Sequence, residues 1–416
     1  MPASSTMTET PSSPGRLAWL IVALLFPVVV LNYLDRQMLA TMKVSMVASI
    51  PDIANKADWG IVLGSFKWVY ALLSPVCGYL ADRFSRRHVI AFSLCAWSAV
   101  TWWTGHVSSF NELVAARALM GVSEAFYFPA ALALIVDFHP GHTRSRAIGL
   151  HQTGIYTGLI LGGFAGYVAE APTLGWSWAF QAAGIVGVLY SVPLLMLLRN
   201  APRHASQAAS PSPVQTMSCL LGNRNFILMV LYTSLPAVAG WVVKDWMPEV
   251  VRERYGLSQG DAGLAAVLSV QIASILGSIT GGYCADRWMR RSNRGRIYAS
   301  ALGMLLFLPA LVGVGRSETL VFAVCFLVIF GIGWGFFDAN NMPILSQITR
   351  PEVRATAFGF MNLITISVGG FADWGFGHLR DEKVAHSLIF DSFAGVAVLA
   401  AAFVLLIRPR EEAPSK

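Results

Sequence analysis

Long apolar runs separated by short polar loops are the dominant pattern along the chain. A helix needs about 20 apolar residues to span the hydrocarbon core of a bilayer, and twelve runs have roughly that length. In lipid the backbone must satisfy its own hydrogen bonds, which predicts helices rather than open strands. The pattern therefore predicts an all-α membrane protein with twelve transmembrane helices, at 17–41, 58–81, 88–106, 110–138, 146–170, 176–198, 225–250, 261–285, 296–315, 318–347, 355–379 and 386–408.

One ten-residue stretch occurs almost twice. The first copy is GYLADRFSRR at 78–87 and the second is GYCADRWMRR at 282–291, so seven of ten positions match at an offset of 204 residues. Each copy ends a long apolar run with an acidic and basic turn. Two related halves that are full of membrane-length segments are typical of a transporter with a binding site between its halves.

Polar residues also recur at related places in the two halves. Glu124 precedes Pro129 by five residues, and Asp338 precedes Pro343 by the same interval. The other correspondences are RSRAIG at 144–149 with RATAFG at 354–359, Gln152 with Asn362, and Asp35-Arg36 with Lys244-Asp245. This recurrence predicts two pseudo-symmetric six-helix bundles with a polar site near the midline.

Basic residues mark alternate loops. Lys and Arg follow the second, fourth, sixth, eighth and tenth runs and are sparse in the other loops. The positive-inside rule then predicts that both termini are cytoplasmic. The polar stretch 199–224 is typical of a flexible linker. We therefore expect a disordered tail at 1–15, bundles at 16–198 and 225–408 with the linker at 199–224 between them, and a C-terminal tail at 409–416.

Composition narrows the functional class. The chain is 55% hydrophobic and 13% charged, with a mean hydropathy of +0.57, whereas soluble domains carry about 25% charged residues. The net charge of +7 gathers in short loops, which favours lipid headgroups over nucleic acid as its partner. Neither the five cysteines nor His139, His142 and His151 have metal-ligand spacing, and no phosphate-binding loop or catalytic triad occurs. We expect no metal, no cofactor and no enzymatic activity.

Charged residues inside the predicted spans are the main candidate site. A charge at mid-membrane costs at least about 2.5–3.5 kcal/mol on insertion scales, so these side chains face a cavity or pair with each other. Arg36 has a planar guanidinium that suits a carboxylate, and we interpret it as a substrate clamp. Glu124 has no basic neighbour in sequence, and we interpret it as a proton-coupling carboxyl. The alternative for Arg36 is a structural ion pair with Asp35 or another helix. The alternative for Glu124 is a permanent salt bridge or permanent protonation.

Asp35 and Lys67 have several interpretations. Asp35 is either a second proton-coupling residue or an anchor for a neighbouring helix. Lys67 attracts an anion, neutralises ionised Glu124, or extends to the membrane interface. Lys67 shares a helix face with Tyr70, which can donate a hydrogen bond to a substrate oxygen.

The second half supplies a further polar group of candidates. Lys244 either faces a cavity as the partner of Arg36 or forms an interfacial pair. Asp338 and Asn340 form a possible polar site, whose alternative role is hydrogen bonding between helices; Asp373 is expected to be structural. The complete expected substrate-binding set is Arg36, Lys67, Tyr70, Gln152, Lys244, Asn341 and Asn362.

The chain resembles the major facilitator superfamily in its doubled loop motif, its twelve spans and its central linker. The resemblance implies two six-helix bundles that rock about a central cavity. It assigns the loop motifs to gating, through Gly78, Asp82, Arg83, Arg87, Gly282, Asp286, Arg287 and Arg291.

A narrower resemblance is to the anion:cation symporter family. The matching residues are NYLDR at 32–36, WVY at 68–70, Glu124-Ala125 with Pro129, and Gln152, while Lys67 departs from that pattern. The resemblance implies proton-coupled symport of a small organic anion such as a sugar acid, by a monomer in the bacterial inner membrane. The spinster-like branch shares several of these motifs, so a carrier of lysolipids or other amphiphiles is the alternative.

Overall fold

The computed structural model describes residues 15–139, 143–200, 218–350 and 353–409, without the side chains of 78–83, 145 and 355. Nearly all of this part of the chain is helical, and it contains no strand. Nearly all of the expected tail at 1–15, most of the expected linker and nearly all of the tail at 409–416 lie outside the described residues. The first half contains α1 (Arg16–Thr41), α2 (Lys43–Ser49), α3 (Lys56–Arg83), α4 (Arg86–Thr104), α5 (Phe110–Glu124), α6 (Tyr127–Phe138), α7 (Arg144–Gly163), α8 (Ala165–Glu170) and α9 (Gly175–Leu197).

The second half contains six long helices. They are α11 (Arg224–Tyr255), α12 (Gln259–Met289), α13 (Gly295–Arg316), α14 (Leu320–Ile348), α15 (Arg354–Asp381) and α16 (His386–Leu406). In the described part of the chain, nine segments are long and apolar enough to cross a membrane. The more polar α4, α7 with α8, and α15 run alongside them, which agrees with twelve spans. The prediction of an all-α membrane fold is confirmed.

The fourth span is broken beside Glu124. Helix α5 ends at this residue and α6 begins at Tyr127. Pro129 has no backbone N–H to bond the carbonyl of Ala125, so a continuous helix would lack a hydrogen bond at this point. The break therefore places Glu124 at a helix end in the middle of the membrane.

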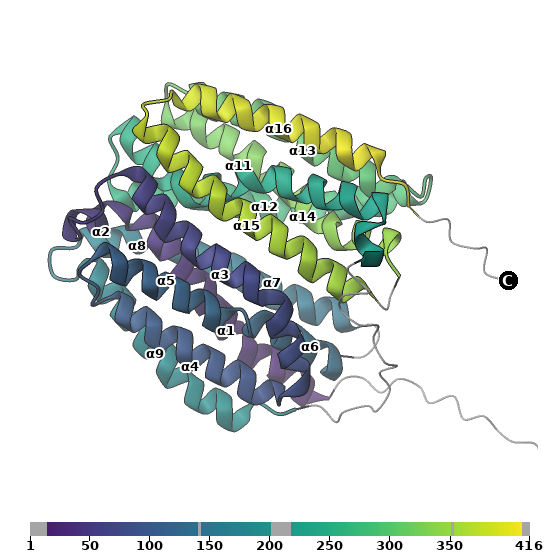
Figure 1. Ribbon diagram of the computed structural model, residues 1–416, viewed down its shortest axis with the longest axis horizontal. Coiled ribbons are helices and arrows are strands. Elements are labelled where there is room, and N and C mark those ends of the chain that lie inside the picture. The colour runs from purple at the N-terminus through teal and green to yellow at the C-terminus, as the bar shows by residue number, and fades with distance from the viewer. Residues whose placement is uncertain (1–14, 140–142, 201–217, 351–352, 410–416) are drawn as a thin grey trace, which may run out of the picture.

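The helices form two bundles, α1–α9 and α11–α16, which lie side by side in Figure 1. The loops rich in Lys and Arg lie at one end of the bundles, here named the basic side; the other end is named the opposite side. Among the described residues, the hydrogen bonds and ion pairs that join the bundles lie at mid-depth or on the opposite side. The structure is therefore closed on the opposite side.

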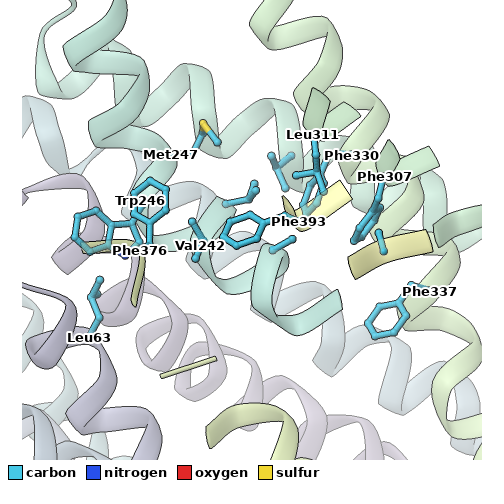
Figure 2. Packing of buried hydrophobic residues seen from close by; sticks show 14 of the residues in the cluster. Leu63, Val242, Trp246, Met247, Phe307, Leu311, Phe330, Phe337, Phe376 and Phe393 are labelled. Atoms are coloured by element: carbon cyan, nitrogen blue, oxygen red, sulfur yellow. The ribbon is translucent and has the colours of Figure 1, made fainter. Parts of the chain in front are cut away.

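Close apolar packing accompanies this closure. Figure 2 shows Leu63 of α3 near Trp246 of α11 and Phe376 of α15, whose rings lie 5.1 Å apart. Backbones also approach closely, because a Cβ on Gly60 of α3 would lie 2.6 Å from the Cα of Trp374 in α15. Helices α3 and α15 thus form the main seam between the bundles.

Candidate functional site

Arg36 and Glu124 form a buried ion pair inside the first bundle. Both Nε and Nη2 of Arg36 donate to Oε2 of Glu124, at 2.9 and 2.5 Å. The guanidinium also lies 4.5 Å from the Phe66 ring and 5.3 Å from the Tyr70 ring. The other oxygen, Oε1 of Glu124, has no hydrogen-bond partner among the described residues. The structure therefore joins the expected clamp, the expected proton carrier and Tyr70 in one place.

Arg117 and Asp35 form a second buried ion pair next to the pair of Arg36 and Glu124. Nη1 of Arg117 in α5 lies 3.6 Å from Oδ1 of Asp35, and the Thr101 hydroxyl donates to Oδ2 of the same carboxylate. Arg117 also lies 4.9 Å from the Phe66 ring, which contacts Arg36 as well. These contacts are the ones that the anchoring interpretation of Asp35 requires.

Lys67 lies at the seam between the bundles. Its ammonium group donates to Asp245 of α11 and to Asp373 of α15, and it lies 4.2 Å from the Trp241 ring. The expected neutralisation of Glu124 by Lys67 is not observed. Lys67 points across the seam, and the ion-pair partner of Glu124 is Arg36. Extension to the interface is not observed either, since the side chain is only 4% exposed.

Lys244 and Asp338 form the charged part of the second bundle. The ammonium of Lys244 lies 4.1 Å from the Trp334 ring and 5.5 Å from the Trp241 ring. It lies where α1, α11 and α12 pack together, with no space for a water molecule between them. Asp338 is exposed at mid-span, and it acts electrostatically on Lys244 and on Tyr33 of the first bundle. The Asp338 carboxylate therefore faces the space between the two bundles.

The expected amide ligands have different surroundings. Oε1 of Gln152 and Oδ1 of Asn341 are buried without a hydrogen-bond partner in the described part of the chain, and their role in substrate binding stays a prediction. Asn340 is buried and donates to the carbonyl of Phe336, one helical turn away, which is a structural contact. Asn362 is half-buried on α15.

The doubled loop motif differs between its two copies. The side chains of Gly78, Asp82 and Arg83 lie outside the described residues. Arg87 donates to the carbonyl of Leu195 at 2.6 Å. In the second copy, the exposed Asp286 lies 4.0 Å from Arg296. Gly282 is half-buried, and Arg287 and Arg291 are exposed. The gating role of both copies stays a prediction.

Four residues on the opposite side form a charged cluster that the sequence reading missed. Lys43 donates to Glu249, Lys56 lies 3.5 Å from the same carboxylate, and Lys56 binds Glu253 at 2.7 Å. Two backbone N–H groups at the start of α3 also donate to Asp381, at 2.9 and 2.8 Å. This latch joins the starts of α2 and α3 to the ends of α11 and α15 across the seam.

Arg117 is the other functional candidate that was missed. It lies in the fourth apolar run, seven residues before Glu124 and thus near the same helix face. The rule that identified Glu124, that a charge within a span requires a partner, also applies to Arg117.

A two-bundle helical protein with ion pairs at mid-membrane and an exposed carboxylate between its halves has the architecture of a solute transporter. A sequence profile described as Major Facilitator Superfamily matches residues 25–372. The chain therefore belongs to the major facilitator superfamily, and it is a membrane transporter rather than an enzyme.

Several characterised proteins are similar along most of the chain. Protein spinster of Drosophila melanogaster is 27% identical over 387 residues, which are 89% of this chain and 63% of spinster, so the chain spans less than two thirds of that relative. An MFS-type efflux pump of Mycolicibacterium smegmatis is 30% identical over 86% of this chain and 83% of its own length. The probable galactarate/D-glucarate transporter GarP of Escherichia coli K12 is 25% identical, over 83% and 84%.

A solved structure supports the fold. It is a bacterial homologue of the human lysosomal transporter spinster in an inward-facing, occupied conformation, with a TM-score of 0.78. The match covers 95% of this chain and 97% of that one at 19% identity. This similarity establishes the fold alone.

Proposed function

We propose that the protein is a proton-coupled symporter of a small organic anion, with a sugar acid such as a hexuronate or aldonate as the substrate class. The observation that carries the proposal is the buried pair of Arg36 and Glu124, in which one guanidinium binds one carboxylate oxygen. An incoming substrate carboxylate is chemically equivalent to the Glu124 carboxylate, which is already bound to the Arg36 guanidinium. Substrate and Glu124 therefore compete for the same cation.

Protonation resolves this competition. A proton on Glu124 removes its charge, weakens its hold on Arg36 and leaves the guanidinium able to bind the substrate carboxylate in a bidentate geometry. Tyr70, Gln152, Asn341 and Asn362 then offer hydrogen bonds to hydroxyl groups, and Lys244 adds positive charge. Loading a proton together with the anion keeps the charge inside the membrane balanced, which permits the bundles to reorient.

Glu124→Gln tests the coupling. The amide mimics a protonated carboxyl, so we expect proton-driven accumulation to be lost while exchange of substrate across the membrane continues. Both are measured in proteoliposomes, with and without a pH gradient. Asp391→Asn is the matched control, because this exposed carboxylate pairs with Arg316 far from the site. Unchanged uphill uptake by Glu124→Gln would refute the coupling role.

An anionic amphiphile is the second candidate substrate. Lys244 lies against the rings of Trp241 and Trp334, so the second bundle combines one cation with an apolar aromatic surface. The 26% identity to the sphingosine-1-phosphate transporter SPNS2 of Xenopus tropicalis agrees with this chemistry. A thermal-shift screen of purified protein separates the two candidates: stabilisation by sugar acids supports the first, and stabilisation by lysolipids supports the second.

The membrane orientation is part of the proposal. The loops rich in Lys and Arg favour placing the basic side in the cytoplasm, together with both termini. In this orientation the closed side faces away from the cytoplasm, and we place the protein as a monomer in a bacterial inner membrane. Protease accessibility of the two termini in inside-out vesicles tests this orientation, and protection of both would contradict it.

A further inference from the structure

Charges in the middle of the spans do not balance. Among the described residues, four basic side chains at this depth face five carboxyls. Three pairs balance one to one: Arg36 with Glu124, Arg117 with Asp35, and Lys244 with Asp338. The surplus carboxyl lies at Lys67, which binds both Asp245 and Asp373.

This cluster is largely buried. The side chains of Lys67, Asp245 and Asp373 are 4%, 14% and 0% exposed. Lys67 of α3 and Asp245 of α11 are the charges that act on Asp373. The carboxylates of the two other helices packed on α15 are engaged elsewhere, since Asp338 of α14 faces Lys244 and Asp391 of α16 binds Arg316.

One oxygen of the cluster accepts no hydrogen bond of normal geometry. Oδ1 of Asp373 is buried and has no such partner among the described residues, and the nearby Trp246 indole is the one further side chain that acts on this carboxyl as a donor. The ammonium of Lys67 lies against the other oxygen, Oδ2, and against Asp245. A buried carboxylate that is neither fully paired nor fully hydrogen-bonded is unfavourable, and adding a proton removes the surplus charge.

We propose that Lys67, Asp245 and Asp373 form a second proton-binding site, which holds one proton while the bundles are closed around it. The ligand is a proton rather than a larger cation, because the Lys67 ammonium already occupies the space between the carboxylates. One proton moves from water to Asp373 when the seam closes. It returns to water when α3 separates from α11 and α15 and the carboxyls become hydrated.

The sign of the effect follows from linkage. Acid favours the conformation that binds the proton more tightly, which is the closed seam. Raising the pH removes the proton and leaves a surplus negative charge in the buried cluster, so the opposite side opens. For one proton, the ratio of open to closed molecules changes by up to about tenfold per pH unit. This site responds to bundle separation, whereas Glu124 lies within the first bundle and responds to substrate.

The test measures opening of the opposite side directly. The full chain, with its five native cysteines replaced by serine, receives spin labels through Asp52→Cys and Glu318→Cys, two exposed positions in loops of different bundles. Distances between the labels are measured in lipid nanodiscs between about pH 5 and about pH 8.5. We expect a long-distance population that grows with pH, by up to about tenfold per unit.

Variants assign the proton to the cluster. Asp373→Asn and Asp245→Asn each leave one carboxyl for one ammonium, so each should remove the pH response; the second variant carries the test if the first does not fold. Asp391→Asn, the matched control, should keep the response. Glu124→Gln should also keep it, even where it abolishes proton-driven uptake.

Any of three pH results would overturn the inference: a wild-type distance distribution that does not change with pH, a response that survives in both aspartate variants, or a response that Glu124→Gln removes. Opening controlled by sodium at constant pH and abolished by the same aspartate variants would overturn it as well. None of these results bears on the Glu124 uptake experiment, so the two proposals fail independently.

Discussion

Arg117 and Asp35 show how single residues stabilise the first bundle. Both are buried, and each supplies the charge that the other requires. Asp35 also accepts a hydrogen bond from Thr101 of α4, so one carboxylate joins α1, α4 and α5. The pair therefore fixes the position of α1, and with it the position of Arg36.

Removal of Arg117 should leave Asp35 as an uncompensated buried charge. We expect Arg117→Met to destabilise the protein by about 3–5 kcal/mol, observed as a lower thermal unfolding midpoint in detergent. Adding Asp35→Asn should recover most of this loss. The control is Arg316→Met, whose exposed pair with Asp391 is worth about 0–1 kcal/mol. Equal effects of the two single variants would contradict the role of Arg117.

The sequence predicted the candidate residues better than their partners. Arg36, Glu124 and Lys67 were identified because a charge within an apolar run requires an explanation. Their pairing depends on which helices pack together and on how each helix is rotated, and a sequence with two similar halves does not determine these. The sequence therefore leaves several roles open for Lys67, among them neutralising Glu124, and none of them names its contacts with Asp245 and Asp373 in the other bundle. Asp373 is expected to be structural, and its two-to-one arrangement with Asp245 around Lys67 was not foreseen.

Glycines set the spacing of α1 and α7. Gly154, Gly158 and Gly162 all face α1, and a Cβ on Gly158 would lie 2.4 Å from the carbonyl oxygen of Val30. This is the close packing that a stripe of small residues predicts in membrane helices. The sequence locates such a stripe because small residues at four-residue intervals share one helix face.

Gly158→Ala should force α1 and α7 apart. We expect overpacking to destabilise the protein by about 1–3 kcal/mol, measured as a fall in the thermal unfolding midpoint. Gly149→Ala is the control on the same helix, because a Cβ at Gly149 would meet no atom within 4 Å. Similar shifts for both variants would show that helix propensity, not packing, decides the outcome.

The whole molecule has one seam that must open and close during transport. The latch formed by Lys43, Lys56, Glu249 and Glu253 closes the seam at its end on the opposite side, and the Lys67 cluster lies deeper. The sequence predicted the two bundles, because their length, periodicity and repeated motif are local properties. The sequence did not predict which end of the bundles is closed, because a carrier uses the same helices whether it is open at one end or at the other.

Gly60→Ala should shift the molecule away from the conformation described. The added Cβ would lie 2.6 Å from the α15 backbone at Trp374, so closure of the opposite side is obstructed. We expect the labels at positions 52 and 318 to report a larger open population, and transport to slow. Gly375→Ala on α15 is the control, since a Cβ there meets nothing within 4 Å. A shorter distance between the two labels in Gly60→Ala would contradict the close packing of α3 against α15 at the seam.

Trp68 of α3 offers a native optical readout of this seam. Its indole lies against Gly370 of α15, where a Cβ would approach Nε1 to 2.5 Å, and its ring is 5.1 Å from that of Phe371. Both neighbours belong to the other bundle, so the indole must exchange protein for water or lipid whenever the bundles part. The emission wavelength of Trp68, isolated by comparison with Trp68→Phe, should therefore track the transport cycle in unlabelled protein.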